Sequence, residues 1–204
     1  DYTKALEYLQ QALDIYQTIA REQGVETGVT LCLKEYSLIY SQSGKPAKAL
    51  EYSHKVLERN QESGNQYGIA NTYFTMGKIY LNTRDSKKSL EYLHKALDMK
   101  RHLEDQVEIP SILRLIGENH MQRAHRDQAL SYFRNALKQA RAQNQREEIK
   151  DVYHDLYLAW KKAGNHQKAL DFYTRYSVLK DSLNNQRISE LEMQYEFEKK
   201  QEQL

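Results

Sequence analysis

The sequence predicts an all-α protein assembled from antiparallel helix pairs that repeat about every 40 residues. The main observation is a short phrase, a small residue followed three positions later by an aromatic residue, that returns at a fixed long period. Such a period is typical of stacked helical repeats, in which each helix pair buries its apolar face against the next. Turn formers are scarce as well, with two prolines and eight glycines in 204 residues. The phrase occurs as Ala49-Leu50-Glu51-Tyr52, Ser89-Leu90-Glu91-Tyr92, Ala129-Leu130-Ser131-Tyr132 and Ala169-Leu170-Asp171-Phe172, in steps of 40 residues, and is foreshadowed 44 residues earlier by Ala5-Leu6-Glu7-Tyr8.

The chain divides into a partial first repeat and four further repeats. Residues 3–22 predict one amphipathic helix, because their apolar residues recur at helical spacing. This helix corresponds to the second helix of a repeat whose first helix is absent. Each later repeat contains a first helix, a short turn and a second helix, as in 29–43 and 46–60, with Pro46 suited to the first helical position. The predicted units are residues 1–28, 29–68, 69–108, 109–148 and 149–184, which together form an array over residues 1–184.

The aromatic residues of this array are expected to be structural. Most of the 16 tyrosines fall on core positions of the repeat, where a buried ring can leave its hydroxyl at the edge. Core packing is therefore favoured over stacking on nucleic-acid bases. Gly77 and Gly117 precede the core residues Tyr80 and His120 by three positions, so that the partner helix can approach closely. The core tyrosines are Tyr8, Tyr36, Tyr40, Tyr52, Tyr73, Tyr80, Tyr92, Tyr132 and Tyr153.

The repeat resembles the tetratricopeptide repeat (TPR), which has Leu-Gly-x-x-Tyr on its first helix and Ala-x-x-Tyr/Phe-x-x-Ala on its second. The resemblance covers roughly residues 3–183, in units about six residues longer than the common length of roughly 34. It implies a right-handed superhelix whose first helices line a concave groove for a protein or peptide. The clearest copies are Met76-Gly77-Lys78-Ile79-Tyr80 with Ser89, Tyr92 and Ala96, and Ile116-Gly117-Glu118-Asn119-His120 with Ala129, Tyr132 and Ala136.

Carried over by register, the resemblance places a set of first-helix residues on this groove. The set is mixed but leans basic, which suits an extended peptide or helix with some acidic character. A solvated face that binds nothing is the alternative. The carboxylate clamp of chaperone-binding members needs a lysine and an asparagine one turn apart, and this sequence lacks it. The expected groove residues include Lys34, Asn71, Phe74, Lys78, Leu81, Arg114, Glu118, His154 and Lys161.

After residue 184 the repeat pattern ends, and residues 185–204 predict a C-terminal amphipathic linker or coiled-coil helix. Ile188, Leu191 and Tyr195 form a narrow apolar seam on it. The helix either caps the last repeat or pairs with a second copy of the chain, and we favour pairing. Residues 180–183 and 190–200 resemble the stretch that follows TPR arrays in bacterial sensor histidine kinases and related signalling proteins. That resemblance implies dimeric signalling, and it favours a periplasmic sensor region over a cytoplasmic one.

The composition and the motifs predict no catalysis within this chain. A net charge of +2 favours neither nucleic acid nor an anionic membrane as a partner, and any membrane segment is expected outside this sequence. The single cysteine, Cys32, excludes an intrachain disulfide, and we find no nucleotide loop or metal-ligand spacing. We therefore expect no catalytic residue, metal or cofactor. The expected function is that of a protein- or peptide-binding sensor or regulatory domain of a bacterial, histidine-kinase-like signalling protein. A cytoplasmic TPR scaffold or a peptide-binding transcriptional regulator is the alternative.

Overall fold

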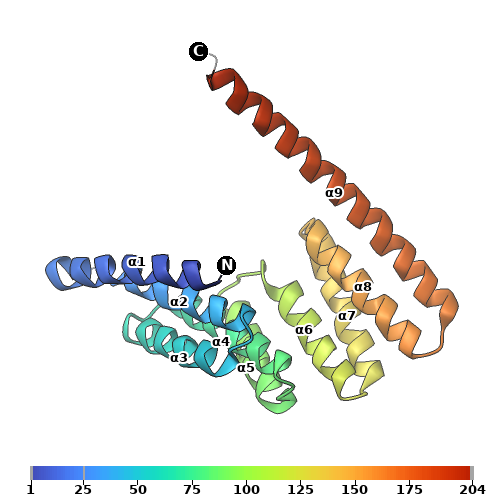
Figure 1. The fold of residues 1–204 in the computed structure, drawn as a ribbon. Helices are drawn as coiled ribbons and strands as arrows, with labels where there is room; N and C mark the ends of the chain where they lie inside the picture. The colour runs from blue at the N-terminus through green and yellow to red at the C-terminus, as the bar shows by residue number, and fades with distance from the viewer. Residues whose placement is uncertain (1, 25, 203–204) are drawn as a thin grey trace. The chain divides into compact units, whose positions relative to one another are not determined.

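The computed structural model describes residues 2–24 and 26–202, and for residues 196–200 and 202 the backbone only. Helices joined by short turns make up this part of the chain (Figure 1). It contains no strand, which confirms the all-α prediction. The helices are α1 (Tyr2–Gln23), α2 (Thr27–Gln42), α3 (Pro46–Glu62), α4 (Gln66–Asn82), α5 (Ser86–His102), α6 (Ile109–Gln122), α7 (Arg126–Ala142), α8 (Arg146–Lys162) and α9 (His166–Glu202).

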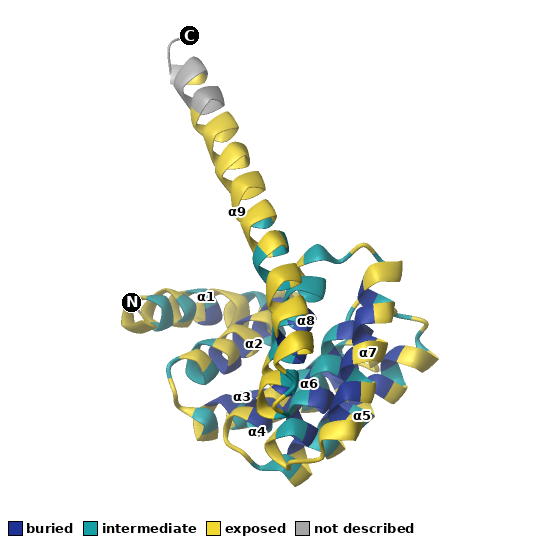
Figure 2. Cartoon of the chain, turned by 90° about the vertical axis from the view of Figure 1, so that its right-hand side faces the viewer, coloured by how far each residue is buried: buried dark blue, intermediate teal, exposed yellow. Residues whose placement is uncertain are grey.

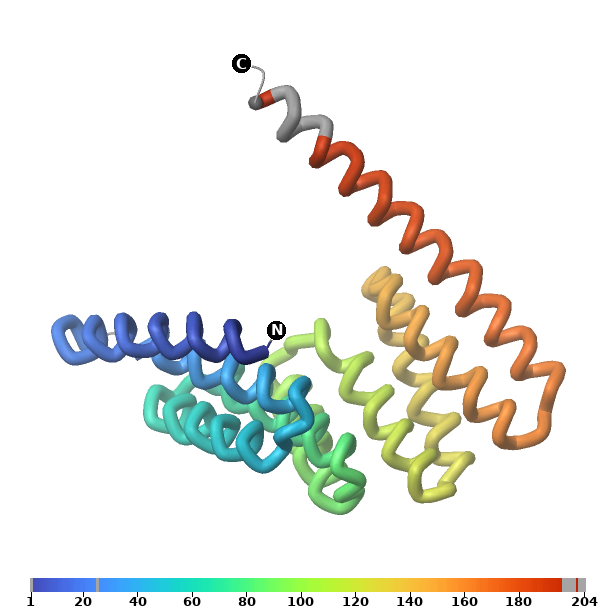
Figure 3. Tube along the Cα trace, in the orientation of Figure 1, coloured from blue at the N-terminus to red at the C-terminus, as the bar shows by residue number. Residues whose placement is uncertain are grey.

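The chain divides into two compact units, Asp1–Leu115 and Ile116–Leu204, and the division falls within the sequence of α6. In the first unit α1 packs on α2, α2 on α3, α3 on α4 and α4 on α5. In the second unit α7 packs on α8 and α8 on α9. The trace reverses direction at the turns within each unit (Figure 3). Each unit is therefore a stack of antiparallel helices, as the repeat pattern predicts.

The turns recur every 20 residues with the same backbone conformation. Each contains one residue in the left-handed region, with φ between 55° and 72°, the usual way to close a helix C-terminus. Glycine fits this conformation freely, whereas another residue accepts a strain of roughly 1–2 kcal/mol. The position is thus more constant along the chain than the residue type. The eight residues are Gly24, Gly44, Gly64, Arg84, Glu104, Ala124, Asn144 and Gly164.

The turn positions correct the register of α1. Gly24 is equivalent to Gly64, so the first step along the array is also 40 residues and not 44. The early phrase that ends at Tyr8 is one helical turn out of register, because α1 extends one turn further towards its N-terminus than α3 does. Leu13, equivalent to Ser53, is buried, whereas Tyr8 is 71% exposed. The prediction that Tyr8 lies in the core is therefore wrong.

The first and second helices of two repeats approach closely at a glycine, as predicted. A Cβ atom added to Gly77 would lie 2.7 Å from the side chain of Leu93, and one added to Gly117 would lie 2.7 Å from the ring of Phe133. Distances this short force a shift of the neighbour, so no larger residue fits either position without rearrangement. The large side chain on the second helix fills the volume that the glycine leaves.

Other core predictions are confirmed. Tyr36 is buried, and its ring stacks on that of Tyr52 with 4.7 Å between centroids. His120, which replaces the repeat tyrosine, is 8% exposed and stacks on the ring of Tyr132 at 5.4 Å. The aromatic positions of the repeat thus hold ring contacts between first and second helices, including the one where histidine stands.

A buried ion cluster lies where α5 meets the turn before α6. The Lys100 ammonium, 2% exposed, lies 2.7 Å from Oδ2 of Asp105 and 2.6 Å from Oε2 of Glu108. Burial by itself lowers the pKa of Lys100, but the hydrogen bonds to the two carboxylates outweigh it and leave the pKa raised. The hydrogen bond from Lys100 lowers the pKa of Asp105 below its ordinary value. The cluster therefore favours the charged forms of Lys100 and Asp105.

The preceding repeat builds the same junction from neutral groups. The positions 40 residues earlier hold Asn60, Asn65 and Gly68. The amide of Asn65 donates to Asn60 Oδ1 at 3.2 Å, and the backbone N–H of Gly68 donates to Asn65 Oδ1 at 3.0 Å. One set of repeat positions thus carries either a charged or a neutral network.

Helix α9 is continuous from His166 to Glu202, with no break where the repeat pattern ends (Figure 3). Its middle is attached to α8 through Arg146, which donates to Ser182 Oγ at 2.8 Å and to Gln186 Oε1 at 3.0 Å. Beyond this point its described residues are exposed (Figure 2). The seam residues Ile188, Leu191 and Tyr195 are 54%, 58% and 67% exposed, so they do not cover the last repeat. Residues 203–204 of the predicted linker, and its side chains at 196–200 and 202, lie outside the described residues.

Candidate functional site

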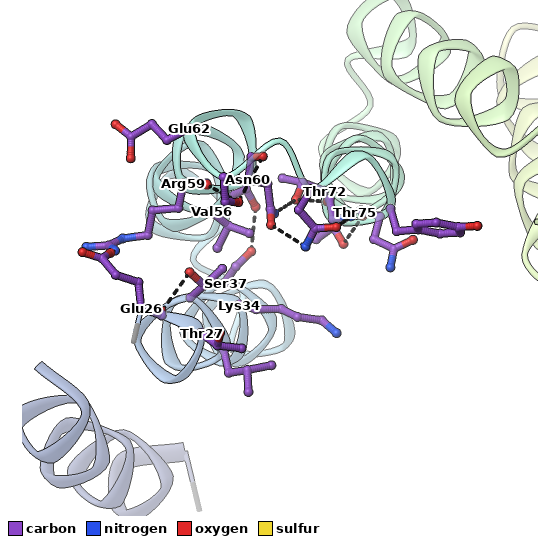
Figure 4. A pocket seen from close by; sticks show the side chains of 18 of the residues that line it. Glu26, Thr27, Lys34, Ser37, Val56, Arg59, Asn60, Glu62, Thr72 and Thr75 are labelled. Carbon is purple, nitrogen blue, oxygen red and sulfur yellow. Dashed lines mark hydrogen bonds and ion pairs between the residues drawn. The ribbon is translucent and has the colours of Figure 1, made fainter. Parts of the chain in front are cut away.

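A pocket of about 660 Å³ opens between the first helices α2 and α4 of the N-terminal unit, with α3 as its floor (Figure 4). Lys34 of α2 and Asn71 of α4, both predicted groove residues, line this pocket. The structure therefore brings together two side chains that are 37 positions apart in the sequence. The other lining residues include Thr27, Thr30, Leu31, Ser37, Ser53, Val56, Arg59, Asn60, Thr72 and Thr75.

Two small residues on the floor give this pocket its depth. The hydroxyls of Ser37 and Ser53 lie 2.7 Å apart and hydrogen-bond to each other. In the next two repeats the position of Ser53 holds Leu93 and Phe133, which fill the corresponding space. The serine side chains are smaller than leucine or phenylalanine, so they fill less of that volume, and they line it with oxygen atoms. Sequence reasoning did not predict this depth, although the two serines at repeat positions were a visible signal.

The charged groups of the pocket lie on opposite sides. Glu26 and Arg59 form an ion pair between the start of α2 and the end of α3. Figure 4 shows this pair on one side, whereas Lys34 extends from α2 to the other, open side. Lys34 is exposed and has no ion pair within the part of the chain that the structure describes. It is therefore free to meet an incoming polar group.

A second pocket, of about 560 Å³, lies between α6 and α8 within the C-terminal unit. The predicted groove residues Glu118 and Lys161 both line it. Its floor differs from that of the first pocket, because the buried ring of Phe133 and the side chain of Leu158, which is 44% exposed, make it apolar. Its remaining lining residues are Met121, Gln122, Asp155 and Lys162.

The other predicted groove residues lie outside these two pockets. Lys78 stacks on Phe74 with 5.4 Å between its ammonium and the ring centroid. Arg114 is half-buried and has partners, and the ring of His154 lies 5.0 Å from that of Tyr176 on α9. Leu81 is 2% exposed, so its predicted place on the groove is wrong. Lys161 stands at the equivalent position of the last repeat and is exposed. Leu81 differs because an apolar side chain gains free energy when it is buried.

The described ranges 2–24 and 26–202 contain neither a cluster of metal ligands nor a membrane-spanning helix. No group of three or more His, Cys, Asp or Glu side chains there is placed to hold a metal ion. Within the described residues, no helix combines the length and apolarity needed to cross a bilayer. Cys32 is buried, and both burial and the nearby Glu35 carboxylate raise the pKa of its thiol. Its thiol is accordingly a poor nucleophile at neutral pH.

No curated protein sequence matches the chain. Among solved structures it is similar to BtubC from P. vanneervenii, with 21% identity over 90% of this chain and 75% of that one, at a TM-score of 0.73. It is also similar to a Rap protein complexed with Competence and Sporulation Factor (18% identity, 87% of this chain and 51% of that one, TM-score 0.71). A third is a signal transduction ATPase with a tetratricopeptide repeat sensor from Pyrococcus horikoshii (19% identity, 91% of this chain and 28% of that one, TM-score 0.73).

These identities are low, so the likeness shows a shared fold. The chain spans about half of the Rap protein and about a quarter of the ATPase. The family model of the tetratricopeptide repeat matches residues 30–102, from α2 to the end of α5. Residues 30–102 therefore carry tetratricopeptide repeats, and the chain over about 90% of its length shares the fold of these helical-repeat structures.

Proposed function

We propose that this chain is a protein- or peptide-binding module that acts as the sensor or regulatory domain of a signalling protein. The observation that carries the proposal is the placement of the groove residues. In each unit, residues from two successive first helices line one pocket: Lys34 with Asn71, and Glu118 with Lys161. A ligand side chain in such a pocket contacts two repeats at once, which is how a repeat array recognises an extended segment.

The structural relatives support the signalling part of the proposal. One relative is a Rap protein in complex with a Competence and Sporulation Factor, and another is a signal transduction ATPase with a TPR sensor. The resemblance of residues 180–183 and 190–200 to the stretch after sensor arrays adds a histidine-kinase-like context, with the output domain outside this chain. The complex of the Rap protein favours, as second candidate, a regulator that binds a signalling peptide.

Charge reversal in the pockets tests this function. Peptides selected on the chain from a random dodecapeptide display library are expected to lose about tenfold or more in affinity with Lys34→Glu or Lys161→Glu, measured by fluorescence polarisation. Both lysines are exposed, so the melting temperature should hardly change. Lys138→Glu is the matched control, because Lys138 is exposed on α7 and outside both pockets. Selected peptides that bind all three variants like the wild type would contradict the proposal.

The exposed end of α9 is a candidate surface for dimer formation. Ile188, Leu191 and Tyr195 recur at spacings of three and four and are all more than half exposed. A helix in water gains most of its stability by burying such a stripe. We infer that this seam pairs with the same seam of a second copy of the chain. The seam covers about one and a half heptads, so the pairing is weak and concentration-dependent.

Sedimentation velocity tests the pairing. The whole chain should show a dimer at high protein concentration, whereas a chain ending at residue 184 should remain a monomer. Leu191→Glu should also give a monomer, because it places like charges opposite each other in the seam. Met193→Glu is the control, since Met193 is 62% exposed and off the seam. A monomeric whole chain at every concentration would reject the seam as an interface.

A further inference from the structure

Part of the pocket between α2 and α4 presents hydrogen-bond acceptors to a ligand. Four of its hydroxyl groups donate their only proton to a backbone carbonyl of their own helix, four residues earlier. A hydroxyl that has donated its proton keeps lone pairs only. Thr72 already accepts from Asn60 Nδ2 at 3.4 Å, and Ser53 is hydrogen-bonded to Ser37 at 2.7 Å, which leaves Thr30 and Thr75 as the acceptors for a ligand. None of the four hydroxyls can donate to a ligand. They are Thr30, Ser53, Thr72 and Thr75, with donor–acceptor distances of 3.3, 2.9, 2.7 and 3.0 Å.

Asn71 adds an acceptor that has no partner. Its Oδ1 atom is buried, and no hydrogen-bond donor within the described part of the chain reaches it. A buried polar atom without a partner costs free energy, so the pocket gains stability from any ligand that donates a hydrogen bond to it. Asn71 lines the same pocket as the four hydroxyls. Asn71 Oδ1 therefore needs a hydrogen-bond donor from the ligand, as the hydroxyl oxygens around it do.

Lys34 sets the opposite requirement at the open side of the pocket. Its ammonium donates only and has no ion pair in the described residues, whereas Arg59 is occupied by Glu26. A ligand group must therefore donate towards the interior and accept near Lys34. A carboxylate only accepts, so its oxygens would face the hydroxyl and amide oxygens of the interior. A ligand ammonium only donates, and Lys34 would repel it.

A primary amide meets both requirements with one small planar group, because its NH₂ donates two hydrogen bonds and its carbonyl accepts. We propose that this pocket binds the side-chain amide of a glutamine or asparagine in a peptide ligand. The NH₂ group points towards Asn71 Oδ1 and the hydroxyl oxygens, and the carbonyl faces Lys34. The inference rests on the proposed peptide-binding function, and for this pocket it proposes an amide in place of the acidic group that the basic groove alone suggests.

Two small probes of the same shape test the preference. N-acetylglutamine N-methylamide and N-acetylglutamate N-methylamide differ in one group, NH₂ against O⁻. In ¹H–¹⁵N correlation spectra of the whole chain, the glutamine probe should shift the resonances of Lys34, Asn71 and Thr75 and bind several-fold more tightly than the glutamate probe. The comparison is stringent, because attraction to Lys34 favours the charged probe. Tighter binding of glutamate, or no shift at these residues with either probe, would overturn the inference.

Replacing threonine with valine shows whether the hydroxyl acceptors cause the preference for the glutamine probe. Thr30→Val with Thr75→Val keeps the shape of the pocket and removes two acceptor oxygens, so affinity for the glutamine probe should fall several-fold. Thr75→Val alone should lower the affinity for the glutamine probe by a smaller factor. It replaces the double variant in this test if the double variant has a lowered melting temperature. Thr174→Val is the matched control, because the Thr174 hydroxyl donates to Leu170 O at 2.9 Å on α9, outside the pocket. Unchanged affinity in the double variant would also overturn the inference.

The two proposals fail separately. Library peptides that depend on Lys34 but show no preference for glutamine or asparagine would retain the peptide-binding function and reject the amide preference. A glutamine probe that binds through Asn71, with no peptide selected from the library, would reject the peptide-binding function and leave an amide site.

Discussion

Lys100→Ala is expected to lower the free energy of unfolding by about 3–5 kcal/mol, because removing one partner of a buried ion cluster strands the others. The Lys100 ammonium is 2% exposed and holds both Asp105 and Glu108. Without it, two carboxylates lie side by side at the end of α5 with no cation between them. Urea unfolding followed by circular dichroism at 222 nm, a wavelength at which helices absorb, measures the loss.

The neutral junction of the preceding repeat supplies the control. The triple variant Lys100→Asn, Asp105→Asn, Glu108→Gly copies Asn60, Asn65 and Gly68 into the equivalent positions. It leaves no unpaired charge, so it should recover most of the stability that Lys100→Ala loses. If both variants are equally unstable, the lysine acts through its packed side chain and not through its charge.

The same cluster gives a pH dependence with a defined sign. The pKa of Asp105 is lowered from 3.8, so its contribution to stability is present above about pH 4 and is lost as the pH falls through the folded pKa. The pKa of Lys100 is raised from 10.5, so its contribution is present below about pH 10.5 and is lost as the pH rises through the folded value. The stability difference between wild type and the neutral triple variant should therefore shrink at both extremes.

Phe133→Ala is the second large effect, expected to cost about 3–5 kcal/mol in the unfolding free energy. The ring is 1% exposed and packs against Gly117, where no side chain is available to fill the space that alanine leaves. Phe133→Leu is the matched control, because leucine occupies the equivalent position of the preceding repeat as Leu93. It should cost less than about 1.5 kcal/mol. A small loss with alanine would mean that α6 and α7 close the gap by moving together.

The helices and their pairing were predictable from the sequence because the period of apolar residues sets both. The register of a helix was harder to predict where its copy of the small-to-aromatic phrase was imperfect. Tyr8 repeated the small-to-aromatic spacing and was placed in the core, but Gly24 fixes the turn and leaves Tyr8 exposed. A turn is a better register mark than an aromatic, because the left-handed residue must stand at the helix end. The sequence did not predict that α9 continues unbroken past residue 184, because the core pattern of the repeat ends there.

Some of the pocket-lining residues were predictable from the sequence, but the chemistry of the pockets was not. The tetratricopeptide resemblance, carried over by register, placed Lys34, Asn71, Glu118 and Lys161 on the groove, and each lines a pocket. Phe74, Lys78, Arg114 and His154, predicted in the same way, line neither pocket. What a pocket accepts depends on where each hydroxyl proton points, which spacing does not specify. Thr75 could serve a ligand as donor or acceptor until its bond to the carbonyl of Asn71 is seen.

The turns that recur every 20 residues have a consequence for how the chain is made. The helix contacts within each unit join neighbours along the chain, so only short loops must close and the entropic cost of closing them is small. Proteins dominated by such local contacts fold within microseconds to milliseconds. A ribosome adds about 5–20 residues per second, so one helix and its turn emerge in about 1–4 s. Once about three repeats have emerged, which is the number a stable array needs, folding is fast enough to keep pace with synthesis.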